Sequence, residues 1–251
     1  MDRSIWTDEI SKHHCPAWQC PRCKIGTVFL TKDSLTYLET IDSLRSHSHE
    51  DFDFEWIEYI FTAWAQCSNK LCNQAFAISG TGGVAPQYVS ESEWEYKPYF
   101  SPKACHPMPD IIMFPNKCPN EIKDELRAAF ESFWSNPAAC ASRMRIALEY
   151  LMNYLSVPKQ KQDSNGKLID LNLHARIDAY AKNDLNIGAQ IMALKWLGNA
   201  GSHEGSLNTT ELLDAFEIME HVLREVISGH SKRVDELAKI LTDKHGKKPI
   251  L

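Results

Sequence analysis

Two close pairs of cysteines in the first third of the chain constrain the fold more than any other feature. The stretch "CPRC" holds Cys20 and Cys23, and "CSNKLC" holds Cys67 and Cys72. Two such turns, separated by a strand-rich segment, present four thiolates that folding can gather around a tetrahedral zinc ion. Four protein thiolates leave no open coordination position, so we expect this Zn²⁺ to be structural rather than catalytic. Metal binding would then supply much of the folding free energy of the few short strands around it.

Other interpretations of the cysteines stay open at this point. The four could be unrelated, or Cys20 and Cys23 could form a redox pair, although no βαβ pattern surrounds them. Cys15, beside His13 and His14, is a possible substitute ligand. Nothing at the start of the sequence is typical of a secretory signal, and no apolar run of about 18 residues occurs. We therefore expect a soluble, cytoplasmic protein with reduced thiols and no membrane contact.

The charge of the chain is unevenly distributed. Its formal net charge of −6 belongs wholly to residues 1–110, which hold 9 Lys and Arg against 15 Asp and Glu. Residues 111–251 hold 18 of each. This balance excludes a globally basic nucleic-acid-binding protein, so any contact with nucleic acid would use a local patch, such as the locally basic C-terminal stretch.

The N-terminal part has short alternating stretches that are typical of strands. Strands are predicted at residues 27–30, 56–64 and 74–80, a turn at "GTGG" (80–83), and an acidic, histidine-bearing loop at 47–55. Six prolines in residues 96–120 indicate an extended linker or a wrap-around arm.

From Asn120 onward the apolar spacing is helical almost throughout. Pro137 opens one helix, and Asn208 with Glu211 forms a plausible capping box for another, which ends at Gly229. The predicted helices cover residues 121–134, 138–155, 168–182, 184–197, 208–228 and 231–244, with a polar loop at 159–167. The sequence thus predicts a mainly α protein. Its predicted parts are an N-terminal β-rich zinc-ribbon domain (1–95), a proline-rich linker or arm (96–120) and an antiparallel α-helical bundle (121–251).

A family resemblance rests on the order of several short motifs. A zinc ribbon and the "FPNKCP" arm are followed by "R-x-A-L-E" and "L-G-N-x-G-S-H". Over residues 18–228 the chain resembles the prokaryotic domain of unknown function forty-one forty-five, which looks like a branch of the HEPN superfamily. The resemblance implies a HEPN-like bundle, a homodimer through that bundle, and a nucleic-acid or defence-system protein partner. Members of the superfamily often act in antiviral defence, and some are metal-independent ribonucleases.

The ribonuclease motif of that superfamily is an Arg, a polar residue, three variable residues and a His. In "GNAGSH", Asn199 matches the polar position and His203 matches the histidine, but Gly198 stands at the Arg position. Such chemistry needs a cation to stabilise the phosphorane while the histidine moves a proton. Here that cation would have to come from Lys195 or Arg145, and a lysine lacks the bidentate fork of arginine.

Structural interpretations compete with the catalytic one. Gly198 could end a helix in the left-handed conformation, with Asn199 hydrogen-bonding the turned backbone and His203 holding the next segment. Arg145 and Glu149, four residues apart on one helix face, could be a surface ion pair or a buried polar anchor facing this corner.

Three functions follow as hypotheses. We expect a noncatalytic or accessory zinc-ribbon and HEPN-like module in a prokaryotic antiviral-defence or nucleic-acid-processing system, binding nucleic acid or a partner protein. The alternative is a metal-independent ribonuclease effector or toxin that uses His203 and Asn199 with Lys195 or Arg145. A third hypothesis is a sensor that binds a nucleotide at the Asn199/His203 corner. Gly198 leaves open whether the chain is an enzyme.

Overall fold

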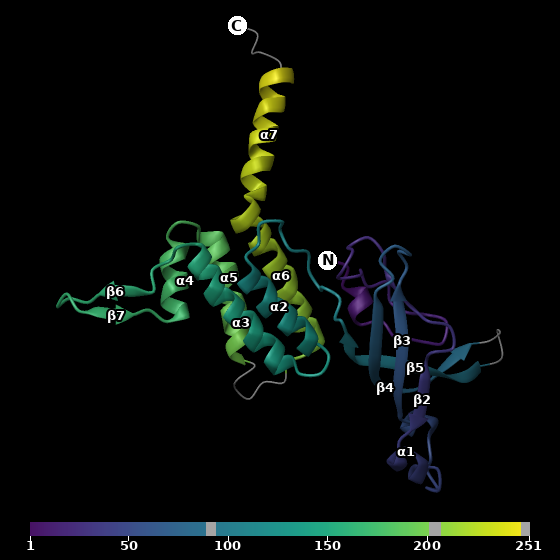
Figure 1. The fold of residues 1–251 in the computed structure, drawn as a ribbon. Coiled ribbons are helices and arrows are strands. Elements are labelled where there is room, and N and C mark those ends of the chain that lie inside the picture. The colour runs from purple at the N-terminus through teal and green to yellow at the C-terminus, as the bar shows by residue number, and fades with distance from the viewer. Residues whose placement is uncertain (89–93, 201–206, 247–251) are drawn as a thin grey trace. The chain divides into compact units, whose positions relative to one another are not determined.

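The structure, a computed structural model, describes residues 1–88, 94–200 and 207–246. It is 44% helical and 23% strand, so the protein is a mixed α/β protein and the prediction of a mainly α fold was wrong. The chain divides into two compact units (Figure 1). Unit 1 comprises Met1–Ile111 and Phe130–Pro137, and unit 2 comprises Ile112–Ala129 and Ala138–Leu251. The domain boundaries at residues 95 and 120 stay predictions.

Unit 1 is built on a five-stranded antiparallel sheet. Its strands are β1 (Val28–Leu30), β2 (Thr36–Glu39), β3 (Tyr59–Cys67), β4 (Ala75–Tyr88) and β5 (Trp94–His106), and its short helices are η1 (Ser4–Trp6), α1 (Ile41–Ser46) and η2 (Phe54–Trp56). The order is β1-β3-β4-β5, with β2 also paired to β3. Side chains of β3 alternate between the core, where Phe61 lies, and solvent, where Trp64 lies. This alternation follows from the two-residue period of a strand that is buried on one face.

The "GTGG" stretch, predicted to be a turn, lies inside β4. A Cβ at Gly80 would be 2.2 Å from the carbonyl oxygen of Ser101, and one at Gly82 would be 2.4 Å from that of Tyr99. These glycines therefore permit a close approach of β4 to β5, beside a register shift between Ser79 and Gly80. The turn prediction was wrong because glycine occurs both in turns and where two strands approach closely, and the sequence does not distinguish the two.

The first part of the proline-rich segment forms β5 rather than an unpaired linker. Pro98 and Pro102 are tolerated because β5 is the last strand in the sheet order, where a missing N–H need not break a ladder. Phe100 exchanges two backbone hydrogen bonds, of 2.7 and 2.9 Å, with Ile10. The N-terminal stretch thereby covers part of this edge.

Unit 2 contains most of the helical residues. Its helices are α2 (Asn120–Ser132, whose end belongs to unit 1), α3 (Pro137–Tyr154), α4 (Leu173–Ala181), α5 (Leu185–Ala200), α6 (Thr209–Ser228) and α7 (His230–His245). Their ends agree with the predicted helices to within three residues, with one exception. Residues 168–170, predicted as the start of a helix, instead form β7 (Leu168–Asp170), which pairs with β6 (Gln160–Gln162) across the predicted polar loop.

The predicted capping of α6 is confirmed. Asn208 and Glu211 form a reciprocal capping box, with 2.9 Å in both directions, and Gly229 is left-handed with φ 59°. The apolar face of α6, including Phe216 and Met219, is fully buried. Among the described residues, no helix combines the length and the apolar character that a membrane span needs.

Candidate metal centre

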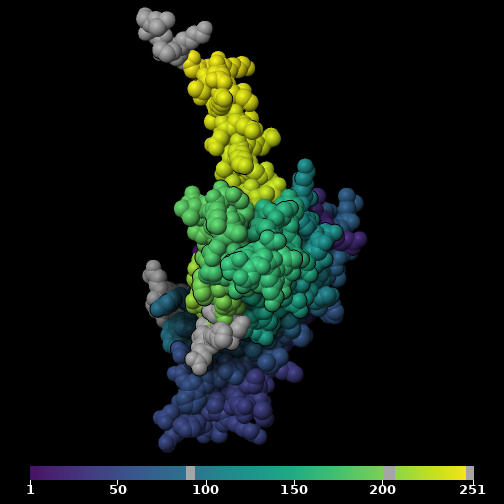
Figure 2. Space-filling view, turned by 90° about the vertical axis from the view of Figure 1, so that its left-hand side faces the viewer, coloured from purple at the N-terminus to yellow at the C-terminus, as the bar shows by residue number. Residues whose placement is uncertain are grey.

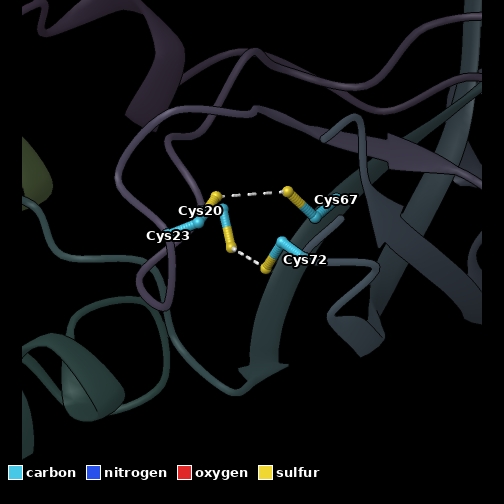
Figure 3. Close-up of side chains that lie close together, drawn as sticks. All are labelled: Cys20, Cys23, Cys67 and Cys72. Atoms are coloured by element: carbon cyan, nitrogen blue, oxygen red, sulfur yellow. Dashed lines mark hydrogen bonds between the residues drawn. The ribbon is translucent and has the colours of Figure 1, made fainter. Parts of the chain in front are cut away.

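The four cysteines of the two predicted pairs lie together in unit 1 (Figure 3). Cys20 and Cys23 precede β1, Cys67 ends β3, and Cys72 lies in the connection to β4. All four Sγ atoms lie within 4.8 Å of one another. The Sγ atoms are 3.8 Å apart for Cys20 and Cys72, and 3.6 Å apart for Cys23 and Cys67. Sulfurs placed about 2.3 Å from a tetrahedral ion are about 3.8 Å apart. The cluster therefore has the dimensions of a metal site and could bind a metal ion.

Backbone N–H groups point at two of the sulfurs. The N–H of Gly26 donates to Cys23 Sγ and that of Asn69 donates to Cys67 Sγ, each at 3.4 Å. The N–H of Gly26 is the main cause that lowers the pKa of Cys23 to about 6, whereas burial raises the pKa of Cys67 to about 12. A bound cation would favour the thiolate form at both positions, because a coordinating thiol loses its proton.

Gly26 lies where the two cysteine turns meet. A Cβ there would be 2.6 Å from Cys67 Sγ and 2.7 Å from the backbone nitrogen of Asn69. Beside it, Thr27 N donates to Ser68 Oγ at 2.9 Å, and Ser68 N donates to the Thr27 carbonyl at 2.8 Å. The turns are thus held together by backbone contact as well as by the sulfurs, and any side chain at residue 26 would separate them.

A cluster of aromatic side chains packs next to the first cysteine turn. Trp18, two residues before Cys20, is fully buried, and its indole N–H donates to the carbonyl of Ile5 at 2.7 Å. Its ring centroid is 6.2 Å from that of Trp6 and 5.3 Å from that of Trp134. Burial of large aromatic surface gives this small unit much of its core, and it places a fluorescent reporter beside the cysteines.

The possible substitute ligands lie outside the group of four. Within the described residues, the candidate metal cluster contains neither Cys15 nor the adjacent histidines. His14 Nε2 instead lies 2.7 Å from Asp8 Oδ2, and burial raises the pKa of Cys15 to about 12. Cys140, which belongs to neither pair, is fully buried in α3.

The predicted helical site is only partly described. His203 lies outside the described residues, while Lys195 and Asn199 lie on α5. Gly198 does not end the helix as predicted, because α5 continues to Ala200. A Cβ at Gly198 would be 2.8 Å from the Cβ of Arg145 on α3. Gly198 therefore permits close packing of two helices, a role that its sequence neighbourhood does not distinguish from a helix cap.

The charged residues near Gly198 contact side chains that are close to them in the sequence. Arg145 Nη1 lies 3.4 Å from Glu149 Oε1, with the two side chains 39% and 46% exposed. In water such a half-exposed pair contributes little to stability. Lys195 is buried, and its Nζ lies 3.4 Å from the ring centroid of Trp196 in a cation–π contact.

Arg176 is a buried polar residue that sequence analysis did not single out. Its Nη2 donates to Asn153 Oδ1 and to the Val157 carbonyl, both at 2.9 Å, and so ties α4 to the end of α3. Burial lowers the pKa of Arg176, and the charge of Glu149 acts in the opposite direction. In the sequence, Arg176 is distinguished only as a basic residue at an apolar position of a short helix.

Two family models match parts of the chain. Residues 8–104, with all four cysteines, match a family described as Domain of unknown function (DUF8608). Residues 127–244 match a family described as Domain of unknown function (DUF4145), as the sequence motifs indicated. Neither description names a metal or a HEPN-like fold, so those parts of the resemblance stay predictions. No curated protein and no solved structure matches the chain.

A single ligand substitution tests the metal centre. Cys67→Ser should abolish stoichiometric metal binding and lower the Tm of unit 1 by more than about 10 °C, because a closed site contributes directly to folding. Metal analysis and thermal denaturation followed by tryptophan fluorescence measure both effects. Cys15→Ser, the same change outside the cluster, should leave both unchanged. Equal metal content and equal Tm in the two variants would contradict a metal centre.

The close contact at Gly198 predicts an unusual sign for a helix substitution. Glycine to alanine inside a helix normally stabilises by about 1 kcal/mol. Gly198→Ala should instead destabilise unit 2 by about 1–3 kcal/mol, because the added methyl meets Arg145 and the helices must separate. Denaturant unfolding measures the change, with Asn186→Ala on the exposed face of α5 as the control. A stabilising Gly198→Ala would show that α3 and α5 do not pack so closely.

Proposed function

We propose that the chain is a noncatalytic recognition module stabilised by a structural zinc ion. Cys20, Cys23, Cys67 and Cys72 would bind the ion as thiolates, and its full coordination by protein favours a structural role over a catalytic one. The module would act as a zinc ribbon joined to a HEPN-like helical unit, in a cytoplasmic antiviral-defence or nucleic-acid-processing system. Its partner would be a nucleic acid or a protein.

The side chains at the tips of the two cysteine turns carry this proposal. We call them the knuckle surface: Arg22, Lys24, Ile25, Lys70 and Leu71. Ile25 is 79% exposed and Leu71 is 99% exposed, although both are large and apolar. Residues 20–26 and 67–73 contain no acidic side chain, within a part of the chain whose excess charge is acidic, although Lys24 forms an ion pair with Asp110. Large apolar side chains that are exposed near an arginine are features of a contact surface.

Site-specific photo-crosslinking tests this surface in cells of the native host. A photoreactive residue in place of Leu71 should crosslink to RNA, DNA or a discrete protein, and nuclease or protease digestion of the product identifies which. A photoreactive residue in place of Tyr88, which is 86% exposed and remote in sequence from both turns, is the control. Metal chelation should abolish the product at residue 71, because the turns lose their shape. Equal products from residues 71 and 88 would contradict the proposal.

A metal-independent ribonuclease is the second candidate, and one contact favours it. Gly198 stands where the motif has its arginine, and Arg145 of α3 packs directly against Gly198. The contact is with the Cβ of Arg145, whose guanidinium lies 3.4 Å from Glu149 and would serve as the cation from the neighbouring helix, with Asn199 one residue beyond Gly198 on α5. Lys195 is less suited to this task, because its Nζ lies over Trp196 in a cation–π contact.

Induction of the chain in cells tests this alternative. A ribonuclease would arrest growth and cleave RNA in the presence of EDTA, and both His203→Ala and Arg145→Ala would restore growth and leave RNA intact. Removal of one catalytic group typically lowers a rate by about 10²–10⁴-fold. Arg143→Ala, an exposed arginine paired with Glu125 at 3.1 Å, is the control. The recognition module predicts no cleavage by any of these proteins.

A further inference from the structure

The connection between α1 and β3 is acidic and rich in aromatic side chains. Residues 47–58 contain no lysine or arginine, and they hold five exposed acidic residues: Glu50, Asp51, Asp53, Glu55 and Glu58. Among the described residues, none of the five forms an ion pair with a lysine or an arginine. His49 Nδ1 lies 3.9 Å from Asp51 Oδ2, and Asp53 Oδ1 accepts the N–H of Glu55 at 2.9 Å. The carboxylates of Glu50 and Glu55 are therefore available to a partner.

Three large aromatic rings are exposed beside these carboxylates. Their exposed fractions are 50% for Phe54, 43% for Trp56 and 55% for Trp94. Glu55 lies between Phe54 and Trp56 in the chain, and Glu50 follows His49, whose ring centroid is 5.6 Å from that of Trp56. We call Glu50, Phe54, Glu55, Trp56 and Trp94 the acidic aromatic surface. Figure 2 shows the segment that holds α1 and η2, coloured indigo to blue, without a covering element on the face drawn.

Ring contacts join the acidic connection to β5. The ring of Phe54 stacks on that of Tyr96, with centroids 4.7 Å apart and planes at 23°. Trp94 meets Tyr96 edge to face at 5.1 Å. The ring of Phe52 contacts those of Phe54 and Trp56, at 5.7 and 6.4 Å. The three exposed rings thus belong to one continuous set of aromatic contacts.

Both ends of the acidic connection are held in place. At its start, His47 Nε2 lies 2.7 Å from Glu39 Oε1, and the His47 ring packs on that of Phe52 with centroids 4.5 Å apart. At its end, the N–H of Glu58 donates to Ser43 Oγ at 3.1 Å. Ser43 is buried, and its Oγ donates to Glu39 Oε1 at 2.6 Å. Groups that are held in place before binding lose less conformational entropy when a partner binds.

The combination of exposed rings and carboxylates fits an arginine-rich protein segment. A guanidinium stacks on the face of an indole or phenyl ring, and it forms paired hydrogen bonds with a carboxylate. The same carboxylates would repel the phosphates of a nucleic acid or of an anionic membrane.

The cations that lie near this surface in the sequence do not neutralise it. Arg45, the last lysine or arginine before the connection, is paired with Asp42 at 3.5 Å. Lys97 falls on the opposite face of β5 from Trp94, because side chains alternate along a strand. The surface therefore keeps its negative charge for a basic partner.

We propose that the acidic aromatic surface binds an arginine-rich segment of a partner protein. Guanidinium groups would stack on Trp56 and Trp94 and pair with the carboxylates of Glu50 and Glu55. The cysteine turns lie at the other end of the nine-residue strand β3, about 25 Å away along the strand. The inference therefore goes beyond the proposed function, because a second surface would bind a different partner.

Fluorescence anisotropy of a labelled peptide with the purified full chain tests this surface. The probe is a short peptide of alternating arginine and glycine, and the wild-type chain should bind it. Trp56→Ala should weaken binding about fivefold, because a cation–π contact is lost. Trp64→Ala, the same change at a 62% exposed tryptophan of β3, should leave binding unchanged.

A second pair of variants separates this surface from a general attraction between a basic peptide and an acidic chain. Glu55→Gln should weaken binding about threefold, whereas Glu9→Gln, the same change at an exposed carboxylate outside the surface, should not. Circular dichroism and metal content confirm that each variant is folded.

Three results would overturn the proposal. One is the absence of peptide binding by the wild-type chain. Another is equal affinity of the peptide for wild type, Trp56→Ala and Glu55→Gln, which would show that net charge alone attracts it. The third is binding of single-stranded RNA that is lost in Trp56→Ala, which would assign the surface to nucleic acid.

Discussion

The approach of four sulfur atoms from two distant turns is the contact on which unit 1 depends. Cys23 and Cys67 are separated by 44 residues, and Cys20 and Cys72 by 52 residues. The sheet between the turns contains strands of three and four residues at β1 and β2, which bury little apolar surface. A metal ion bound by the four cysteines would join the two turns and so close the chain segment between them. Its binding free energy would offset the cost of burying thiols such as Cys67. The aromatic cluster around Trp18 and the exposed knuckle surface both take their positions from these turns.

The sequence predicted the parts of this arrangement that depend on local chemistry. The spacing of Cys20, Cys23, Cys67 and Cys72 identified the cluster, because each turn needs only its own few residues. The capping box of Asn208 and Glu211 was predictable for the same reason, because both residues lie at the start of one helix. The lengths of β4 and β5 were not predictable in this way. Glycines and prolines are typical of turns and linkers, and only the partner strand shows that Gly80 permits a close contact and that Pro98 lies at an edge.

Gly198 in the helical unit is another residue whose role depends on a distant element. A glycine near the end of an apolar helical stretch indicates a cap, but the observed role is contact with Arg145 on another helix. Arg176 escaped notice for the same reason, since its hydrogen-bond partners lie near the end of α3, 19 and 23 residues earlier in the sequence. Residues whose roles are set by a distant element cannot be assigned from sequence spacing alone. The contact between Gly198 and Arg145 is also the observation that favours the second candidate function, a nuclease site.

X-ray absorption spectroscopy at the zinc K edge of the purified full chain tests the central claim most directly. The account predicts one zinc ion per chain with four sulfur ligands at about 2.3 Å. Loss of that signal in Cys67→Ser would tie the ion to the cluster. A chain that contains no stoichiometric metal after purification under reducing conditions would contradict the account. So would a zinc ion bound mainly by nitrogen or oxygen, because the observed cluster offers four thiols.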